Sequence, residues 1–174
     1  MTLLLISLAC IGLLITAAWY DFSSRTIPNK VSLAILFLAC LRFLITGNDP
    51  LVPLGISLLV LCVGFLLYLG RLLGAGDTKL MAALSLFLEP AAMPGFLVIT
   101  ALSGGLLALF TVLKEVSVKL GLDATSASAL KQRADTGRTS GDLPYGVAIA
   151  AGGVFAVFSS EPGIYEWFCA TFFS

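Results

Sequence analysis

Long apolar runs alternate with short polar breaks along the whole chain. The runs predict membrane helices near residues 2–20, 31–46, 52–73, 79–93, 94–113 and 143–159. The breaks are rich in Gly, Pro, Asn and Asp, which interrupt helices. We therefore predict an all-α polytopic membrane protein with about six transmembrane helices, and we expect residues 1–174 to form a single transmembrane domain.

The first run, residues 2–20, differs from a cleaved signal peptide in two ways. No basic residue precedes Leu3, and no small-x-small cleavage site precedes Trp19-Tyr20-Asp21. The run is also close to the length that a bilayer-spanning helix requires, roughly 20 residues. We expect it to be a retained transmembrane helix.

Lysine and arginine occur mostly in alternate loops. The loops after the first, third and fifth runs contain them, whereas the second and fourth loops and the C-terminal tail contain none. Arg42, near the outer end of the second run, is the exception. Because such residues favour the cytoplasmic side, we expect these three loops in the cytoplasm and both termini on the non-cytoplasmic side. Asp21, just beyond the first run, and Asp77, ahead of the fourth, would then share the cytoplasmic face.

The composition indicates a membrane protein and limits the kinds of partner that we expect. Hydrophobic residues make up 59% of the chain and charged residues 11%, with a mean hydropathy of +1.03, whereas soluble domains have roughly 25% charged residues. The lipid bilayer is thus an expected partner, and a net charge of +0 gives no reason to expect nucleic acid. The cysteines lie far apart in apolar runs without C-x-x-C spacing, so we expect no zinc site and no disulfide framework.

One long polar segment, residues 114–142, interrupts the pattern. We expect the fifth helix to continue over 113–122 and a short helix to follow over 123–134. A solvated cytoplasmic loop is the favoured interpretation, and docking of a basic substrate segment or of anionic lipid is the alternative. The aromatic residues of the tail, 159–174, suit an interfacial anchor at the outer leaflet.

The missing histidine restricts the catalytic groups that this chain can use. Ser-His-Asp triads, Ser-His dyads and zinc H-E-x-x-H sites are excluded, and no lysine lies in the middle of a run to form a Ser-Lys dyad. Asp21 and Asp77 remain as a candidate pair of acid and base. Two close carboxylates cannot both ionise, so one would keep a proton while the other activates water.

The sequence around Asp77 favours a site. Gly74 and Gly76 permit positive φ and a close approach of the backbone, and the start of a helix favours an ionised carboxylate. The alternative is that Gly-Ala-Gly is a turn and Asp77 an ordinary N-cap. A third aspartate, Asp142 in Ser-Gly-Asp, is interpreted as a turn or cap residue.

Three segments together resemble a known family. The first is Asp-Phe-Ser-Ser-Arg-Thr-Ile-Pro-Asn at 21–29, the second is Gly-Ala-Gly-Asp-Thr-Lys-Leu at 74–80, and the third is Leu-Pro-Tyr-Gly at 143–146. In this combination and order they resemble the type IV prepilin peptidases of the GxGD aspartyl protease class. The resemblance extends from the first run to the sixth.

The resemblance implies roles for individual residues. Asp21 and Asp77 would be the catalytic pair, with no metal and no cofactor. The candidate supporting and substrate-binding residues are Gly74, Gly76, Lys79, Arg25, Pro28, Asn29, Pro144, Tyr145 and Gly146.

The resemblance also implies an activity and a location. It implies a multi-pass hydrolase of the bacterial cytoplasmic (inner) membrane, which removes the short basic leader from type IV prepilins or pseudopilins on the cytoplasmic face. Larger members carry an N-terminal domain with paired C-x-x-C motifs and also methylate the new terminus. This chain is similar to the short, peptidase-only members that serve Flp (tight-adherence) pili, so we expect no methyltransferase activity. Pilus and secretion assembly proteins are further candidate partners.

Two alternatives stay open at this point. One is a related GxGD protease that acts on a preflagellin or on another signal-peptide-like substrate. The other is a non-catalytic scaffold, or a small transporter coupled to ions or protons, in which the aspartates bind cations. No inverted repeat is evident in the sequence, which weakens the transporter hypothesis.

Overall fold

The computed structural model describes residues 1–119 and 145–160. In chain order the elements are α1 (Thr2–Ser24), α2 (Asn29–Thr46), α3 (Leu51–Leu69), α4 (Ala75–Phe87), the 3-10 helix η1 (Pro90–Ala92), α5 (Met93–Lys119) and α7 (Tyr145–Ser160). The described part of the chain thus contains six α-helices and no strand, which confirms the all-α class for these residues.

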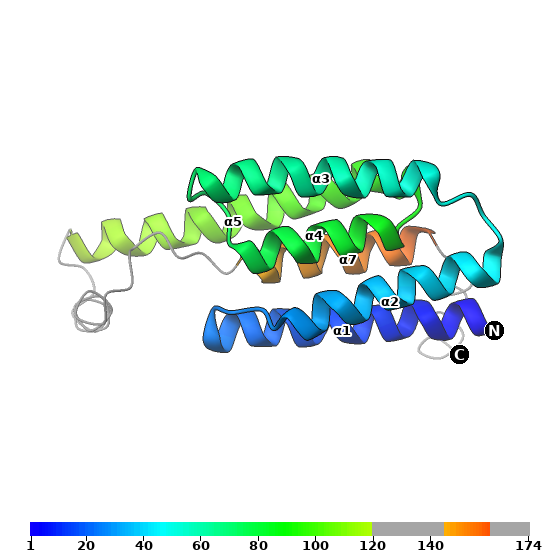
Figure 1. Cartoon of the computed structure of the whole chain (residues 1–174). Coiled ribbons are helices and arrows are strands. Elements are labelled where there is room, and N and C mark those ends of the chain that lie inside the picture. The colour runs from blue at the N-terminus through cyan, green and yellow to red at the C-terminus, as the bar shows by residue number, and fades with distance from the viewer. Residues whose placement is uncertain (120–144, 161–174) are drawn as a thin grey trace, which may run out of the picture.

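The helices lie side by side in three layers (Figure 1). α1 and α2 pack together on one side, α3 and α5 lie on the opposite side, and α4 and α7 lie between them. Contacts agree with this arrangement, because α4 packs against α2, α3 and α7, and α7 packs against α1, α4 and α5. The two central helices are therefore the ones that begin at the second and third motif segments.

The outer helices have the length and exposure of membrane spans. Four stretches are long and apolar enough to cross a bilayer, namely Thr2–Ser24, Asn29–Thr46, Leu51–Leu69 and Pro90–Leu113. α7 is a shorter apolar helix, and α4 has only 13 residues. Large apolar side chains along α3 and α5, such as Leu58, Phe65 and Leu106, are exposed. Exposed apolar surface along whole helices is what lipid contact requires, so the fold is that of a membrane protein.

The first helix is longer than the hydropathy pattern predicted. α1 continues past Tyr20 to Ser24 and ends at Arg25, whose left-handed backbone (φ 55°) closes the helix. The Ser24 hydroxyl donates to the Tyr20 carbonyl at 2.8 Å. Asp21 therefore lies inside the helix and not beyond it, because hydropathy marks the apolar run and not the last hydrogen-bonded turn.

The boundaries around α4 also differ from the prediction. α3 ends at Leu69 and not near residue 73, because Gly70 and Arg71 turn the chain, the latter with a φ of 57°. α4 spans Ala75–Phe87, so the predicted run at 79–93 begins too late and ends too late. Pro90 lies at the start of η1, where a proline without an N–H is tolerated.

The fifth helix continues as far as Lys119, which confirms the predicted extension of this helix up to that residue. The predicted short helix at 123–134, the remaining part of the polar segment and the tail beyond residue 160 lie outside the described residues.

Glycines allow α7 to lie close to its neighbours. A Cβ on Gly153 would come within 2.6 Å of Leu84 Cδ2 in α4 and within 2.9 Å of Leu14 Cδ1 in α1. A Cβ on Gly152 would collide with Thr100 in α5. The position of α7 is thus fixed from several sides, which matters because its first turn enters the site described below.

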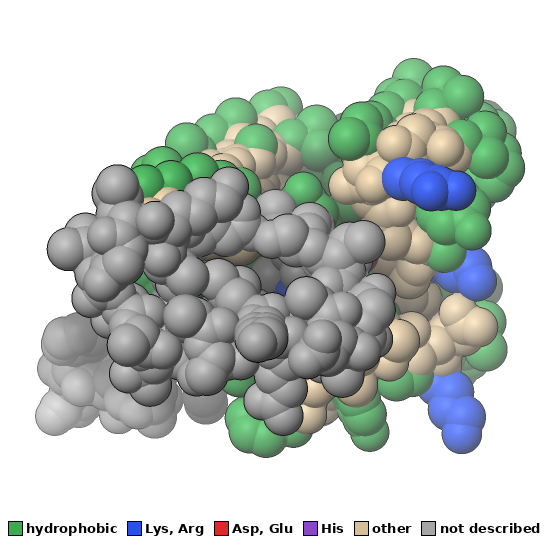
Figure 2. Space-filling model, turned by 90° about the vertical axis from the view of Figure 1, so that its left-hand side faces the viewer, with side chains coloured by type: hydrophobic (Ala, Val, Ile, Leu, Met, Phe, Trp, Pro, Cys, Tyr) green, Lys and Arg blue, Asp and Glu red, His purple; other side chains and the backbone are tan. Residues whose placement is uncertain are grey.

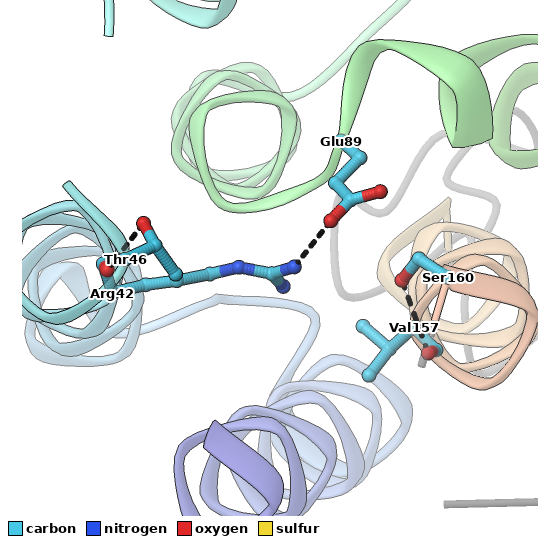
Figure 3. A network of polar contacts seen from close by, with 5 residues as sticks. All are labelled: Arg42, Thr46, Glu89, Val157 and Ser160. Atoms are coloured by element: carbon cyan, nitrogen blue, oxygen red, sulfur yellow. Dashed lines mark hydrogen bonds and ion pairs between the residues drawn. The ribbon is translucent and has the colours of Figure 1, made fainter. Parts of the chain in front are cut away.

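An ion pair between a buried arginine and a half-exposed glutamate lies where α2 and α4 end (Figure 3). The Arg42 side chain is only 8% exposed, and its Nη2 donates to Glu89 Oε1 at 2.9 Å. Its guanidinium also lies 5.3 Å from the centre of the Phe87 ring. The pair neutralises the one cation that interrupted the alternation of charge in the sequence. We call this end of the bundle the arginine end.

Candidate active site

At the opposite end of the bundle, α1 ends and α4 and α7 begin (Figure 1). Asp21 lies in the last turn of α1, and Asp77 lies in the first turn of α4. Both side chains are buried, since the residues are 5% and 8% exposed. We call this the aspartate end. The fold therefore brings together the two carboxylates that the sequence analysis selected.

The two carboxylates form a pair in which each has one oxygen that is available to accept a hydrogen bond. They interact electrostatically with each other. Asp21 Oδ2 and Asp77 Oδ1 are both buried and accept no hydrogen bond from residues 1–119 or 145–160. A buried polar atom without a partner is costly, and in a native fold it requires an explanation such as a catalytic role. These two oxygens are the ones that a water molecule or a substrate carbonyl can engage.

The start of α4 orients Asp77. Gly74 is the N-cap of the helix, and its backbone N–H donates to the Asp77 carboxylate. Asp77 is thus the third helical residue and reaches back to the N-cap, as an acidic residue does in a capping box. The interpretation of Asp77 as the N-cap itself is therefore wrong. The helix dipole favours negative charge at this position.

The two glycines of this motif provide space and not positive φ. Gly74 has a φ of −74°, Gly76 lies within α4, and Gly47 is the only described glycine with positive φ. The expectation of positive φ at these glycines is therefore wrong, but the expected close approach is confirmed. A Cβ on Gly74 would lie 2.7 Å from Asp77 Oδ2, and a Cβ on Gly76 would lie 3.3 Å from Ile27 Cβ.

The loop between α1 and α2 packs against the start of α4. Lys79 Nζ donates to Asn29 Oδ1 at 3.2 Å, which joins the two motifs directly. Pro28 is the extended N-cap of α2, with φ −62° and ψ 133°. Arg25, the C-cap of α1, interacts electrostatically with Asp21. Four of the predicted supporting residues thus lie at the aspartate end.

The first turn of α7 meets Asp21. Tyr145 is the first residue of this helix, and the backbone N–H groups of Gly146 and Val147 lie near the Asp21 carboxylate. A Cβ on Gly146 would lie 2.8 Å from Asp21 Cβ. Two of the predicted supporting residues therefore lie at the aspartate end, and Gly146 contacts the candidate pair. Pro144 lies outside the described residues, as does Asp142.

Val147 and Thr78 contribute to the site without having been predicted. Val147 contributes only its backbone N–H, which any residue except proline carries, so no side-chain signal exists. Thr78 Oγ1 lies 3.1 Å from the Gly74 carbonyl and 3.2 Å from the Gly64 carbonyl, which ties the start of α4 to α3. The sequence signal for this contact was Gly64, a small residue among large apolar ones in the third run.

The described part of the surface at the aspartate end carries basic side chains. Figure 2 views the aspartate end, where Lys and Arg side chains lie on the coloured part of the surface and no acidic side chain is visible among them. The basic residues that the helix ends place here are Arg25, Lys30, Arg71 and Lys79. Within the described ranges, no three His, Cys, Asp or Glu side chains are close enough to hold a metal ion.

Comparison with protein-family models gives a match to the type IV leader peptidase family over residues 8–109. The match covers more than half of the chain and includes Asp21 and Asp77 with the motif segments that contain them. A search of the curated proteins and a search of the solved structures found no match. The chain therefore belongs to the type IV leader peptidase family.

Proposed function

We propose that this protein is a membrane-embedded aspartyl endopeptidase that removes the short basic leader from type IV prepilins or pseudopilins. The observation that carries the proposal is the pair of buried aspartates on α1 and α4, each with an oxygen that no described residue engages. Membership of a peptidase family and the absence of histidine from the sequence support the assignment.

The chemistry follows from the pairing of like charges. Two interacting buried carboxylates hold one proton between them, because ionising both is costly. One carboxylate then accepts a proton from water, and the other donates its proton to the scissile carbonyl oxygen. The burial of both groups strengthens these interactions, since the surrounding protein and lipid screen charge poorly.

Charge distribution supports cleavage at the cytoplasmic face of a bacterial inner membrane. Among the described residues, four basic side chains belong to the loops and helix starts of the aspartate end, whereas Arg42 at the arginine end is ion-paired. Because basic residues are retained on the cytoplasmic side, this asymmetry favours a cytoplasmic aspartate end in a multi-pass protein.

The test is leader removal from a co-expressed type IV prepilin. We expect the intact protein to cleave the leader, and Asp21→Ala and Asp77→Ala to lose cleavage while they remain inserted in the membrane. Asp49→Ala, which changes an exposed carboxylate far from α4's first turn, and Asp142→Ala serve as controls that keep activity. Full cleavage by the Asp77 variant would overturn the proposal.

The same assay compares substrate classes. Prepilins of the Flp type, other pseudopilins and a preflagellin are presented in parallel, each with its own leader. We expect the Flp-type prepilin to be cleaved fastest. A protein that cleaves only the preflagellin would retain the aspartyl mechanism and contradict the proposed substrate.

A further inference from the structure

α3 packs against α4 along one narrow stripe. The α3 residues that are buried or hydrogen-bonded to α4 recur every three or four positions, on one face of the helix, and they are Pro53, Ser57, Val60 and Gly64. The Ser57 hydroxyl donates to the Ala82 carbonyl at 2.8 Å, and Thr78 Oγ1 lies 3.2 Å from the Gly64 carbonyl. The second of these contacts comes from the residue that follows Asp77 in the chain, so it joins α3 to the first turn of α4.

Gly64 gives Thr78 room to reach the backbone of α3. A Cβ on Gly64 would come within 2.7 Å of Thr78 Cγ2, closer than real Cβ contacts, so a larger residue there displaces the threonine. Thr78 is only 4% exposed, and Gly64 is also buried. Because water is excluded, a hydrogen bond between these residues is stronger than an exposed one. The methyl group and the hydroxyl of Thr78 thus both fit against a single glycine of α3.

The beginning of α4 needs support from outside the helix, because the first four N–H groups of a helix have no acceptor within it and helix ends fray. Thr78 supplies this support in two directions. Its N–H donates to the Gly74 carbonyl at 3.1 Å, and its hydroxyl shares one proton between the carbonyls of Gly74 and Gly64. Gly74 is the N-cap, and a Cβ on it would lie 2.7 Å from Asp77 Oδ2. The contacts of Thr78 therefore fix the helix start and the space beside the Asp77 carboxylate.

A second link from this end of α4 constrains it less. Lys79 Nζ donates to Asn29 Oδ1 in α2 at 3.2 Å, but this hydrogen bond is exposed. Water replaces an exposed hydrogen bond at little cost, whereas a buried acceptor that loses its donor is costly. The buried link to α3 is therefore the stronger of the two.

We propose that Thr78 is a positioning residue, which docks the first turn of α4 on Gly64 of α3 and thereby holds the Asp77 carboxylate in place. Thr78 is not a catalytic residue, because its hydroxyl is buried and directed at two backbone carbonyls. The inference rests on the proposed peptidase function, and it adds α3 to the elements that set the geometry of the aspartate pair.

The direct test removes the hydroxyl and keeps the shape of the side chain. Thr78→Val retains the methyl group beside Gly64 but cannot donate a hydrogen bond. We expect kcat for prepilin cleavage to fall about 10- to 100-fold, since a catalytic group displaced by about 1 Å loses a factor of that order. KM should stay within about twofold, because no contact with substrate is removed. Thr78→Ser, which keeps the hydroxyl, should retain most of the rate of the unaltered protein.

The matched control is Ser57→Ala. It also removes a hydroxyl contact between α3 and α4, but at Ala82, more than one helical turn beyond Asp77. We expect this control to keep kcat per folded molecule, with the folded fraction of every variant measured by thermal unfolding in the same micelles. If Thr78→Val and Ser57→Ala have the same kcat per folded molecule, the inference is overturned, because a merely structural contact has that signature.

A pair of variants tests the steric side of the same contact. Gly64→Ala places a Cβ 2.7 Å from Thr78 Cγ2, so kcat should fall, whereas Gly55→Ala, also in α3, meets nothing within 4 Å and should keep the rate. In Gly64→Ala/Thr78→Ser the methyl group is absent, and the nearest atoms that remain, Cβ and Oγ1, lie at 3.4 Å. This double variant should be at least about tenfold faster than Gly64→Ala. Equal rates for the two would contradict the inference.

Failure of the positioning role and failure of the peptidase proposal give different results. Leader removal by both Asp21→Ala and Asp77→Ala contradicts the peptidase proposal itself. Inactive aspartate variants together with full activity of Thr78→Val contradict only the role of Thr78.

Discussion

The arginine end and the aspartate end both bury charge, but they treat it differently. At the arginine end, Arg42 meets Glu89 at 2.9 Å and also lies over the Phe87 ring (Figure 3). At the aspartate end, two carboxylates of like charge interact, and each retains one oxygen without a partner among the described residues. One end pairs its buried charge with an opposite charge, and the other end brings two like charges together.

The difference separates a structural site from a chemical one. Two opposite charges stabilise each other as long as both are present, and removing the partner of a buried charge is strongly destabilising. A pair of like charges gives the fold no such benefit, so its retention points to a use outside folding. Stability and activity should therefore respond oppositely to substitutions at the two ends.

The largest effect is expected at Asp77. Asp77→Asn keeps an oxygen that accepts the Gly74 N–H but removes the titrating group, so prepilin cleavage should fall by roughly 10²–10⁴-fold. The free energy of unfolding should stay the same or rise, because a buried like charge disappears. Cleavage rate and thermal unfolding are measured in the same detergent micelles. A clear loss of stability in Asp77→Asn would contradict the view that the aspartate pair does not stabilise the fold.

Glu89→Gln should have the opposite signature. It removes the Glu89 carboxylate from the buried Arg42 and should lower the free energy of unfolding by about 2–4 kcal/mol, since half of the Glu89 side chain is exposed and screened. The folded fraction should still cleave the leader. The double variant Arg42→Met/Glu89→Gln should recover most of the stability, and failure to recover would show that Arg42 matters mainly through contacts other than Glu89.

Gly74→Ala should reduce activity at the aspartate end without removing a functional group. The added Cβ would lie 2.7 Å from Asp77 Oδ2, so the carboxylate must move, and we expect kcat to fall about 10- to 100-fold. Gly12→Ala in α1, where a Cβ meets nothing within 4 Å, is the control; it should keep the rate and should not lower stability, because alanine favours a helix more than glycine does. Equal activity of the two variants would show that the Asp77 position tolerates displacement.

The smallest effect is expected for the hydrogen bond that joins the two motifs. Lys79→Met removes an exposed contact of 3.2 Å to Asn29 and should cost about 0.5 kcal/mol, with less than a threefold change in rate. A double-mutant cycle with Asn29→Ala measures the coupling. A rate loss of more than about 100-fold would instead assign Lys79 a contact with substrate or with the aspartates.

Sequence reasoning located the elements and the candidate pair better than it located the details. Apolar runs identify helices because burial in lipid requires them, and the missing histidine left the aspartates as the main acid–base candidates. Helix ends depended on backbone conformation that hydropathy does not report, such as the left-handed Arg25 and Arg71. The donors to Asp21 were hidden for a different reason, because a backbone N–H is independent of residue type.

The role of the motif glycines was also only partly predictable. Their small size indicated a close approach, but the sequence did not distinguish a positive φ from an absent Cβ. At Gly74 the backbone is extended and the space is occupied by a carboxylate, so the residue is small for steric reasons. Distinguishing the two explanations required the position of the neighbouring side chain, which is a tertiary property.

The contrast between α3 and α4 predicts which amino-acid substitutions each helix tolerates during evolution. In α4 nine of 13 residues are buried, whereas in α3 only Pro53, Val60 and Gly64 are buried among 19. A side chain that faces lipid needs only to be apolar, whereas packed protein neighbours also restrict its volume and shape. In a saturation library selected for cleavage, α3 should therefore accept many interchangeable apolar residues. Of these two helices, α4, which carries Asp77, should hold nearly all of the sequence constraint.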